Sequence, residues 1–169
     1  MEEWKDIPGY KGIYQASNLG MIRTAPGKIT ETKRHGERHW QTRTLKTRGK
    51  QASGYRASLW KDGKPKDYLV ARLVAMTWVD GYQEGMTVNH KNGNRFDNRI
   101  ENLEWMTLGD NIRHGFATGL YPGIKTTLRN LKTGKEITFR STSEASRYLG
   151  YNSRYLHTKI KRAEGKEPK

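Results

Sequence analysis

Residues 88–111 read VNHKNGNRFDNRIENLEWMTLGDN, and this stretch decides the fold of the central part of the chain. Short apolar runs on either side of a polar, turn-rich segment predict two strands joined by a loop. Thr107 and Asp110 have the spacing of an N-terminal capping box, which predicts the start of a helix. The expected order is a strand at residues 86–90, a polar loop at residues 91–101, a strand at residues 103–106 and a helix over residues 107–118.

Four side chains of this segment fit the chemistry of phosphodiester hydrolysis. That reaction needs a base that deprotonates water, a cation that neutralises charge on the phosphate, and a group that holds the base in place. His90 ends the first predicted strand, and Asn89 lies beside it. Asn102 precedes the second strand, and Asn111 lies in the first turns of the helix. Each residue taken alone is better explained as a turn, cap or structural residue, but their joint spacing indicates an active site.

The region before this segment predicts a small β unit, a basic arm and a buried helix. Residues 4–23 contain short extended pieces broken by Gly and Pro, and Asp62-Gly63 predicts a β-hairpin turn. The apolar run at residues 69–79 predicts a helix that belongs to the core. Residues 28–50 are basic and lack apolar periodicity, so they form either a loop that contacts DNA or a solvated linker. The residues of this arm that we expect to contact DNA are Lys33, Arg34, Arg38, Arg43, Lys46 and Arg48.

The C-terminal region predicts a hairpin followed by two short helices. A Lys-Thr-Gly-Lys turn at residues 132–135 separates two strand-like runs, and Ser141 and Glu144 form a second capping box. Two short helices joined by a Gly-containing turn, the second helix being basic, are typical of a helix-turn-helix. A helical hairpin that only packs is the alternative. The residues of the last helix that we expect to contact DNA are Arg154, Tyr155 and Lys159.

The charge of the chain points to a polyanionic partner. The 169 residues include 32 Lys and Arg against 17 Asp and Glu, a formal net charge of +15. Residues 1–67 carry +8, residues 68–119 carry −1 and residues 120–169 carry +8. Two basic flanks around a near-neutral centre favour DNA binding by the flanks, because Lys and Arg release counterions from phosphates. A basic, solvated surface of the ribosomal-protein type is the alternative that composition leaves open.

Composition also excludes several classes. The absence of Cys excludes disulfides, thiolate zinc sites and cysteine nucleophiles, so a metal would need nitrogen or oxygen ligands. No apolar run is long enough to span a membrane, and the first residues lack the pattern of a signal peptide. We therefore expect a soluble protein that is not exported, built from small units with thin cores.

The residues at 88–94, 98–107 and 110–112 resemble the HNH nuclease signature of phage and intron homing endonucleases. The flanks are similar too, since residues 4–20 look like the N-terminal β module of such nucleases and residues 138–160 like their C-terminal helix-turn-helix repeat. The resemblance implies an α+β protein with a ββα-metal core. Its expected domains are a β module with a basic arm at residues 1–67, the HNH core at residues 68–119 and the hairpin with helix-turn-helix at residues 120–169.

The resemblance also implies roles for individual residues. It makes His90 the general base, and it makes Asn102 the residue that orients His90 through a side-chain hydrogen bond to the ring. Asn89 and Asn111 would supply oxygen ligands to one Mg²⁺ or Mn²⁺ ion. Many relatives have Asp where this chain has Asn89, and the neutral amide removes one negative charge from the metal site.

Two functions follow as hypotheses. The first is a site-specific DNA endonuclease that acts as a monomer on double-stranded DNA and nicks one strand, because each chain has a single active site. The resemblance places it in the cytoplasm of a bacterial host cell, encoded by a phage. The second is a non-catalytic DNA-binding protein or repressor that keeps the HNH core as a scaffold.

Overall fold

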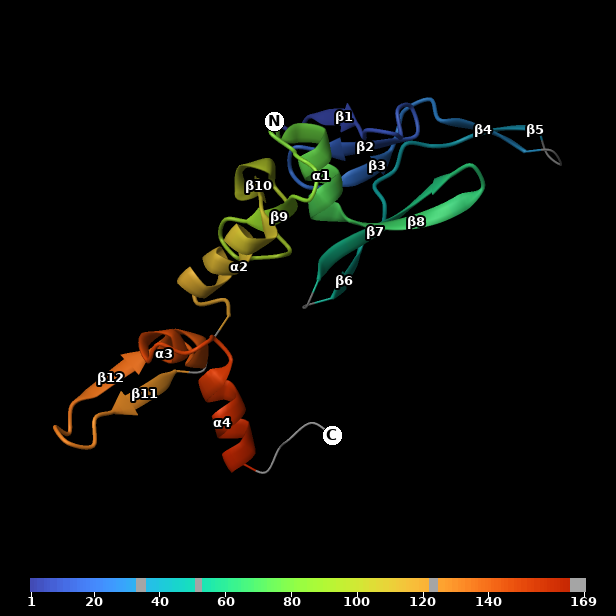
Figure 1. The fold of residues 1–169 in the computed structure, drawn as a ribbon. Helices are drawn as coiled ribbons and strands as arrows, with labels where there is room; N and C mark the ends of the chain where they lie inside the picture. Colours follow the sequence, from blue (N-terminus) through green and yellow to red (C-terminus); the bar gives the residue numbers. More distant parts are fainter. Residues whose placement is uncertain (33–35, 51–52, 122–124, 165–169) are drawn as a thin grey trace. The chain divides into compact units, whose positions relative to one another are not determined.

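The computed structural model describes residues 1–32, 36–50, 53–121 and 125–164. The chain divides into two compact units, Met1–Thr118 and Gly119–Lys169, each of which is described by itself (Figure 1). Lys33 and Arg34, two of the residues expected to contact DNA, lie outside the described residues. Among the described residues, no helix has both the length and the apolar character that a membrane span requires.

The first unit combines four small antiparallel β structures with two helices (Figure 1). Strands β1, β2 and β3 form one sheet, β4 and β5 a ribbon, β6, β7 and β8 a second sheet, and β9 and β10 a hairpin. The elements are β1 (Trp4–Asp6), β2 (Tyr14–Ser17), β3 (Ile22–Thr24), β4 (Ile29–Thr32), β5 (Gly36–His39), β6 (Arg48–Lys50), β7 (Gly54–Lys61), β8 (Lys64–Leu69), α1 (Val70–Trp78), β9 (Thr87–His90), the short 3₁₀ helix η1 (Ile100–Asn102), β10 (Leu103–Met106) and α2 (Leu108–Ala117).

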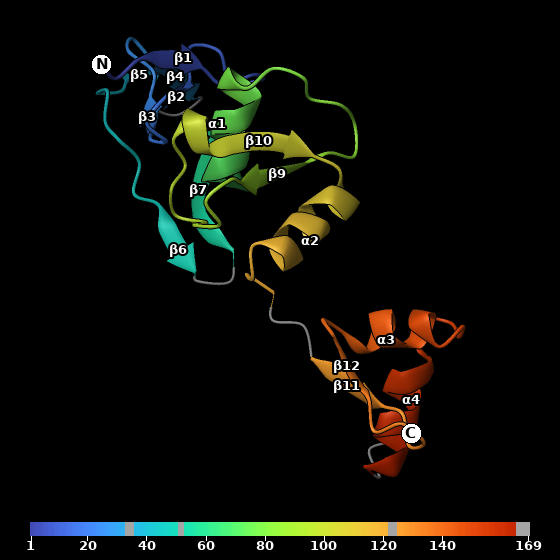
Figure 2. The ribbon, with the colours of Figure 1, turned by 90° about the vertical axis from the view of Figure 1, so that its left-hand side faces the viewer.

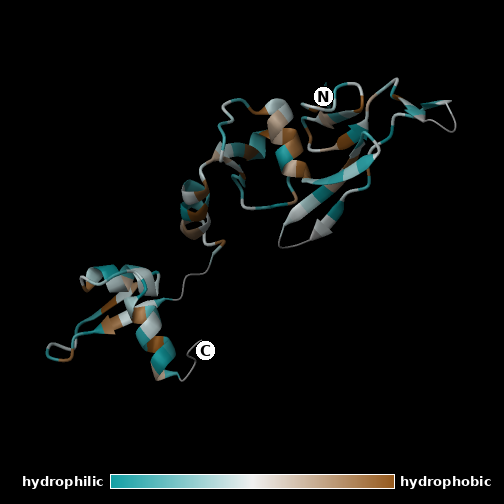
Figure 3. Ribbon diagram, turned by 45° about the vertical axis from the view of Figure 1, so that its right-hand side comes forward, coloured by the Kyte–Doolittle hydropathy of each residue, from teal (hydrophilic) through white to brown (hydrophobic). Residues whose placement is uncertain are grey.

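Helix α1 is the centre of the core, as the apolar run at residues 69–79 predicts. It is largely hydrophobic (Figure 3) and packs against strands from the N-terminal sheet, β7 and the β9–β10 hairpin. Trp78 Nε1 donates a hydrogen bond of 3.0 Å to the carbonyl oxygen of Ala16 in β2. Burial of apolar side chains from all these elements holds the unit together. The largest fully buried ones are Ile7, Ile22, Leu59, Val70, Leu73, Val74 and Leu103.

This shared core changes the expected division of the chain. The boundary expected between residues 67 and 68 falls inside strand β8, and buried residues on both sides of it belong to one cluster. The structure therefore joins the N-terminal β module and the central segment in one unit. The division between Thr118 and Gly119 lies one residue from the other expected boundary.

The basic arm is more ordered than its sequence indicates. We expected a loop over residues 28–50, and this is wrong for strands β4, β5 and β6. Trp40 Nε1 donates to Thr30 Oγ1 at 2.8 Å, and the Lys28 ammonium lies 4.1 Å from the centre of the Tyr14 ring. The exposed β4–β5 ribbon is held by backbone pairing and by such contacts at its base. An exposed ribbon needs no buried face, so its sequence has no apolar alternation to reveal it.

The central segment folds as predicted. Strands β9 and β10 pair in antiparallel fashion, and α2 follows directly. Thr107 caps α2, because its Oγ1 accepts a hydrogen bond from the backbone N–H of Asp110. The hairpin turn predicted at Asp62-Gly63 joins β7 and β8, with both residues in the left-handed region.

The second unit is a hairpin with two helices and a very small core. Strand β11 (Thr126–Arg129) pairs with β12 (Glu136–Phe139), and α3 (Thr142–Tyr148) precedes α4 (Tyr155–Ala163). Ser141 caps α3 by accepting from the N–H of Glu144, as the second capping box predicts. Ser146 is fully buried and accepts a hydrogen bond from the N–H of Leu156, which ties α4 to α3. The predicted hairpin and helices are present, while the helix-turn-helix role in DNA binding stays a prediction.

Candidate active site

The hairpin β9–β10 lies between α1 and α2, and its register assigns each side chain to a face (Figure 2). Leu103 pairs with His90, and Glu104 pairs with Asn89. Because alternate residues of a strand point to opposite faces, His90 shares the face of buried Leu103, towards α1. Asn89 and Glu104 point to the other face, where α2 packs against both strands.

His90 is fixed by a residue that sequence reasoning missed. Its Nε2 lies 3.1 Å from Oδ1 of Asn98, which is 5% exposed. A carbonyl oxygen can only accept, so the neutral ring carries its proton on Nε2 and keeps the lone pair of Nδ1 for a base role. The half-buried ring also lines a small pocket with Leu69, Ala71 and Arg72 from the end of β8 and the start of α1.

The surroundings of His90 favour its neutral form. Burial lowers the pKa of the His90 imidazole below its ordinary value, and the nearby charge of Arg95 acts in the same direction. The hydrogen bond to Asn98 and the charge of Asp97 oppose this shift without cancelling it. Only the neutral form of histidine can accept a proton from water.

The orienting role predicted for Asn102 is wrong as a side-chain contact. Asn102 Oδ1 accepts a hydrogen bond of 2.9 Å from the N–H of Asn92, and its Nδ2 donates to the carbonyl oxygen of Asp97 at 2.7 Å. Both ends of its side chain therefore brace the loop that connects β9 and η1. Asn102 acts on His90 only through the path of this loop, which carries Asn98.

Further contacts inside the loop keep that path. The Arg99 guanidinium donates two hydrogen bonds of 2.8 Å to the Asp97 carboxylate, and Asn92 Nδ2 donates to it at 3.0 Å. These donors, Arg99 above all, lower the pKa of Asp97 to about 2. Asp97 is therefore ionised at neutral pH and holds both ends of the loop.

Two glycines from the N-terminal half close against the same loop. A Cβ atom on Gly20 would lie 2.8 Å from the backbone and Cβ of Asn98, and one on Gly54 would lie 2.5 Å from the carbonyl oxygen of Arg95. Both glycines have positive φ values, +89° and +73°. The N–H of Ile100 donates to the carbonyl oxygen of Asn18 at 3.0 Å. The β2–β3 turn thus holds the residue that contacts His90.

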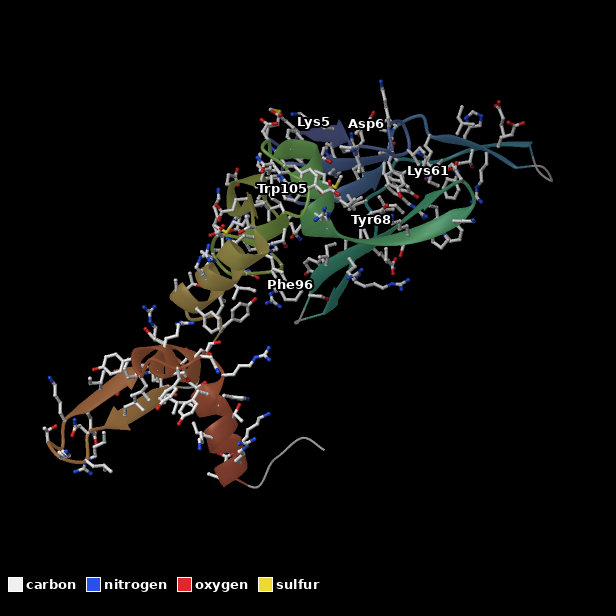
Figure 4. All side chains as sticks on the ribbon, in the orientation of Figure 1. Lys5, Asp6, Lys61, Tyr68, Phe96 and Trp105 are labelled. Carbon is white, nitrogen blue, oxygen red and sulfur yellow. The ribbon has the colours of Figure 1, made fainter. Side chains whose placement is uncertain are left out.

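Phe96 fastens the loop to the second sheet. It lies by the β6 and β7 side of the unit (Figure 4), and its ring is 4.9 Å from that of Tyr55 in β7. Gly54 and Tyr55 thus both contact the loop, from the start of β7. The loop is enclosed by β structure on two sides.

The predicted metal ligands lie on the other face of the hairpin. Asn89 is 5% exposed, and its Nδ2 donates a hydrogen bond of 2.8 Å to Glu104 Oε1. Asn111 is half-buried in α2, which packs against β9 and β10. Amide and carboxylate oxygens are the ligands that Mg²⁺ and Mn²⁺ prefer, so this donor set fits such an ion. In the described ranges, no three His, Asp or Glu side chains are grouped so as to hold a metal, so phosphate and water would complete the shell.

The residues expected to contact DNA lie on exposed surfaces of both units. The Arg38 guanidinium stacks 4.1 Å from the centre of the Trp40 ring, and Arg43 is exposed. Lys46 and Arg48 line a hollow beside β7. In the second unit, one groove along α4 collects Arg154, Tyr155 and Lys159. No described contact assigns these side chains to a competing structural role in an ion pair.

Comparison with known families matches both halves of the first unit. Residues 2–57 match the NUMOD4 motif, and residues 72–113 match the HNH endonuclease family. The second match contains every residue of the candidate active site that the first unit contributes from β9, the loop, β10 and α2. The NUMOD4 match contains Gly20 and Gly54, which close against the loop.

Individual relatives agree with these matches. The chain is 37% identical to DNA endonuclease I-HmuI of Bacillus phage SP01 over 117 residues, which are 69% of this chain and 59% of that protein. It is 33% identical to the uncharacterized HNH endonuclease L247 of Acanthamoeba polyphaga mimivirus over 92% of this chain and 37% of the relative. The chain thus spans less than two thirds of the length of either relative.

A solved structure is similar as well. The structure described as DNA binding and cleavage by the HNH homing endonuclease I-HmuI is 29% identical, with a TM-score of 0.56 over 98% of this chain and 91% of that one. Two family motifs in order along the sequence, with a structural likeness over nearly the whole length, show that this chain belongs to the HNH homing endonuclease family.

Proposed function

We propose that this chain is a site-specific DNA endonuclease that hydrolyses a phosphodiester bond and nicks one strand of double-stranded DNA. The observation that carries the proposal is His90, held by Asn98 at the end of β9, with the oxygen donors of Asn89 and Asn111 on the neighbouring face. His90 is the general base in this proposal, with Nδ1 accepting the proton of the attacking water.

The arrangement suits an in-line displacement, in which the attacking and leaving oxygens lie on opposite sides of phosphorus. His90 and Asn89 are adjacent in an extended strand and therefore point to opposite faces of the hairpin. A phosphate at the end of β9 could meet the base from one face and the oxygen donors from the other. When bound, Mg²⁺ or Mn²⁺ would supply positive charge for the phosphate and the leaving oxygen.

The basic surfaces account for binding rather than chemistry. Arg38, Arg43, Lys46 and Arg48 of the first unit would contact phosphates near the cut, and the α4 groove would contact DNA further away. The I-HmuI structure is described as one of DNA binding and cleavage, which supports DNA as the partner. A single active site per chain favours a monomer that cuts one strand.

Supercoiled plasmids that carry a library of random inserts test this proposal. We expect the protein with Mg²⁺ or Mn²⁺ to produce open circles, and sequencing of the new ends should locate one preferred site on one strand. The His90→Ala variant is the control for a contaminating nuclease. Equal amounts of open circles from both proteins would overturn the proposal.

A non-catalytic DNA-binding protein is the second candidate, and the neutral side chain of Asn89 favours it. An amide binds a divalent ion less tightly than a carboxylate does, and a weak metal site would leave a folded scaffold without chemistry. Tight binding to one sequence without nicking at any concentration of Mn²⁺ would support this second candidate.

A further inference from the structure

Glu104 in β10 is placed where a carboxylate would compensate for the neutral side chain of Asn89. The two residues are register partners on the face of the hairpin that α2 covers. Asn89 Nδ2 donates to Glu104 Oε1 at 2.8 Å. This bond fixes the amide with its nitrogen towards Glu104, so that its oxygen points elsewhere.

Neither side chain has its bonding capacity filled by the described part of the protein. Apart from their mutual hydrogen bond, no contact described for Asn89 Oδ1 or Glu104 Oε2 joins them to another side chain. None of the ion pairs in the described ranges involves Glu104. A half-buried carboxylate with only an amide for a partner leaves its charge uncompensated, and this attracts a cation.

We propose that Glu104 supplies the negative charge of the metal site, and that its carboxylate and the Asn89 amide oxygen bind one Mg²⁺ or Mn²⁺ ion together. The inference rests on the proposed function in taking Asn89 as a ligand, and it moves the charge from β9 to β10. The chemistry of both donors is that of a hard divalent cation. The exchange of an Asp at position 89 for Asn is thereby balanced across the hairpin.

A purely structural role is the rival account of the same hydrogen bond. Cross-strand polar pairs stabilise hairpins without binding any ligand. Glu104→Gln separates the two accounts, because the Gln carbonyl oxygen still accepts from Asn89 Nδ2 while the charge is lost. A structural role predicts no change in metal binding, whereas a metal site predicts a large one.

Mn²⁺ binding to the full chain without DNA is the measurement, followed through the electron paramagnetic resonance signal of the free ion. We expect Glu104→Gln to weaken Mn²⁺ binding by about 10–100-fold, the range typical of changes beside a metal. Glu101→Gln, an exposed residue in the neighbouring loop that loses the same charge, should bind Mn²⁺ like the wild type. Asn89→Asp with Glu104→Gln should restore binding, which also shows that the hairpin still folds.

Wild-type Mn²⁺ affinity in Glu104→Gln would overturn the inference. Nicking by the same proteins keeps the inference apart from the proposed function. If the wild type nicks DNA and Glu104→Gln binds Mn²⁺ normally, the inference fails and the function stands. If no protein nicks DNA and Glu104→Gln still loses Mn²⁺ affinity, the metal site stands and the function fails.

Discussion

His90 shows how little a single residue type says about its role before its neighbours are known. The same side chain at the end of a strand would be structural if its nitrogen atoms were both engaged. Here Asn98 engages Nε2, and the ring reaches a pocket at the start of α1. The remaining nitrogen is what makes a base possible.

Removing the imidazole should therefore abolish cutting and spare binding. We expect His90→Ala to reduce the nicking rate by at least about 100-fold, because a general base contributes on this scale. DNA affinity should stay near that of the wild type, since phosphate contacts come from the basic surfaces. Single-turnover nicking and a gel-shift titration measure the two effects. Nicking within tenfold of the wild type would remove His90 from the role of base.

Asn98 should matter through the orientation of the ring. We expect Asn98→Ala to lower the single-turnover rate by up to about 100-fold, because a misplaced base loses most of its effect. Asn98→Asp, which keeps an acceptor oxygen, should retain the Nε2–H tautomer in ¹⁵N spectra of the His90 ring, and Asn98→Ala should lose it. An unchanged tautomer in Asn98→Ala together with a full nicking rate would show that Asn98 only fills space.

At the scale of elements, the loop between β9 and η1 is held from inside and outside. Inside it, Asn102 and Asp97 bind backbone and side-chain groups of the loop. Outside it, the β2–β3 turn and the start of β7 approach so closely that only glycine fits. The N-terminal sheet therefore has a positioning role in addition to any contact with DNA.

Gly20→Ala tests that positioning role. The added Cβ would meet the Asn98 backbone at 2.8 Å, and the backbone at φ +89° disfavours any side chain. We expect a loss of about 1–3 kcal/mol in urea denaturation and a reduced nicking rate. Gly9→Ala is the matched control, since Gly9 has φ +79° with no atom within 4 Å of a Cβ. Equal nicking rates in the two variants would show that contact with the loop is irrelevant.

Asp97 should make the stability of the first unit depend on pH in the acid range. Its pKa is about 2 in the folded protein and lies near 3.9 in an unfolded chain. Ionised Asp97 thus stabilises the fold above about pH 4, and this contribution is lost as pH falls from about 4 to 2. Urea denaturation should find Asp97→Asn less stable than the wild type at pH 7, with the difference shrinking towards pH 2. A difference independent of pH would contradict this.

At the scale of the whole molecule, charge is distributed between two units with different tasks. The first unit contains the candidate active site and the basic arm, and the second contains a basic helix with a small core. The second unit has few buried apolar residues, so its contribution is a charged and aromatic surface. DNA affinity should therefore be dominated by electrostatics.

That expectation gives a steep dependence on salt. If about 6–10 phosphates are contacted, affinity should fall roughly 10³–10⁵-fold between 50 and 200 mM salt. Fluorescence anisotropy with a labelled duplex at several salt concentrations measures the slope. Substituting Lys46 and Arg48 together by Gln should reduce the slope by about two contacts. A flat response would contradict DNA binding by the basic surfaces.

The sequence by itself determined the strand, loop, strand and helix around His90, both capped helix starts and the buried helix α1. Each of these depends on groups within a few residues of one another, such as Thr107 and the N–H of Asp110, so a local pattern suffices. It also determined the basic surfaces, because charge is a property of composition.

Only the tertiary structure decided which asparagine meets His90. Asn92, Asn94, Asn98 and Asn102 lie in one loop and have the same amide group, so spacing cannot rank them. The path of the loop is set by Asn18, Gly20 and Gly54, which are far away in sequence and act through a hydrogen bond and close packing. The pairing of Asn89 with Glu104 likewise depends on the register of the hairpin, in which a slip by one residue would put Glu104 on the other face.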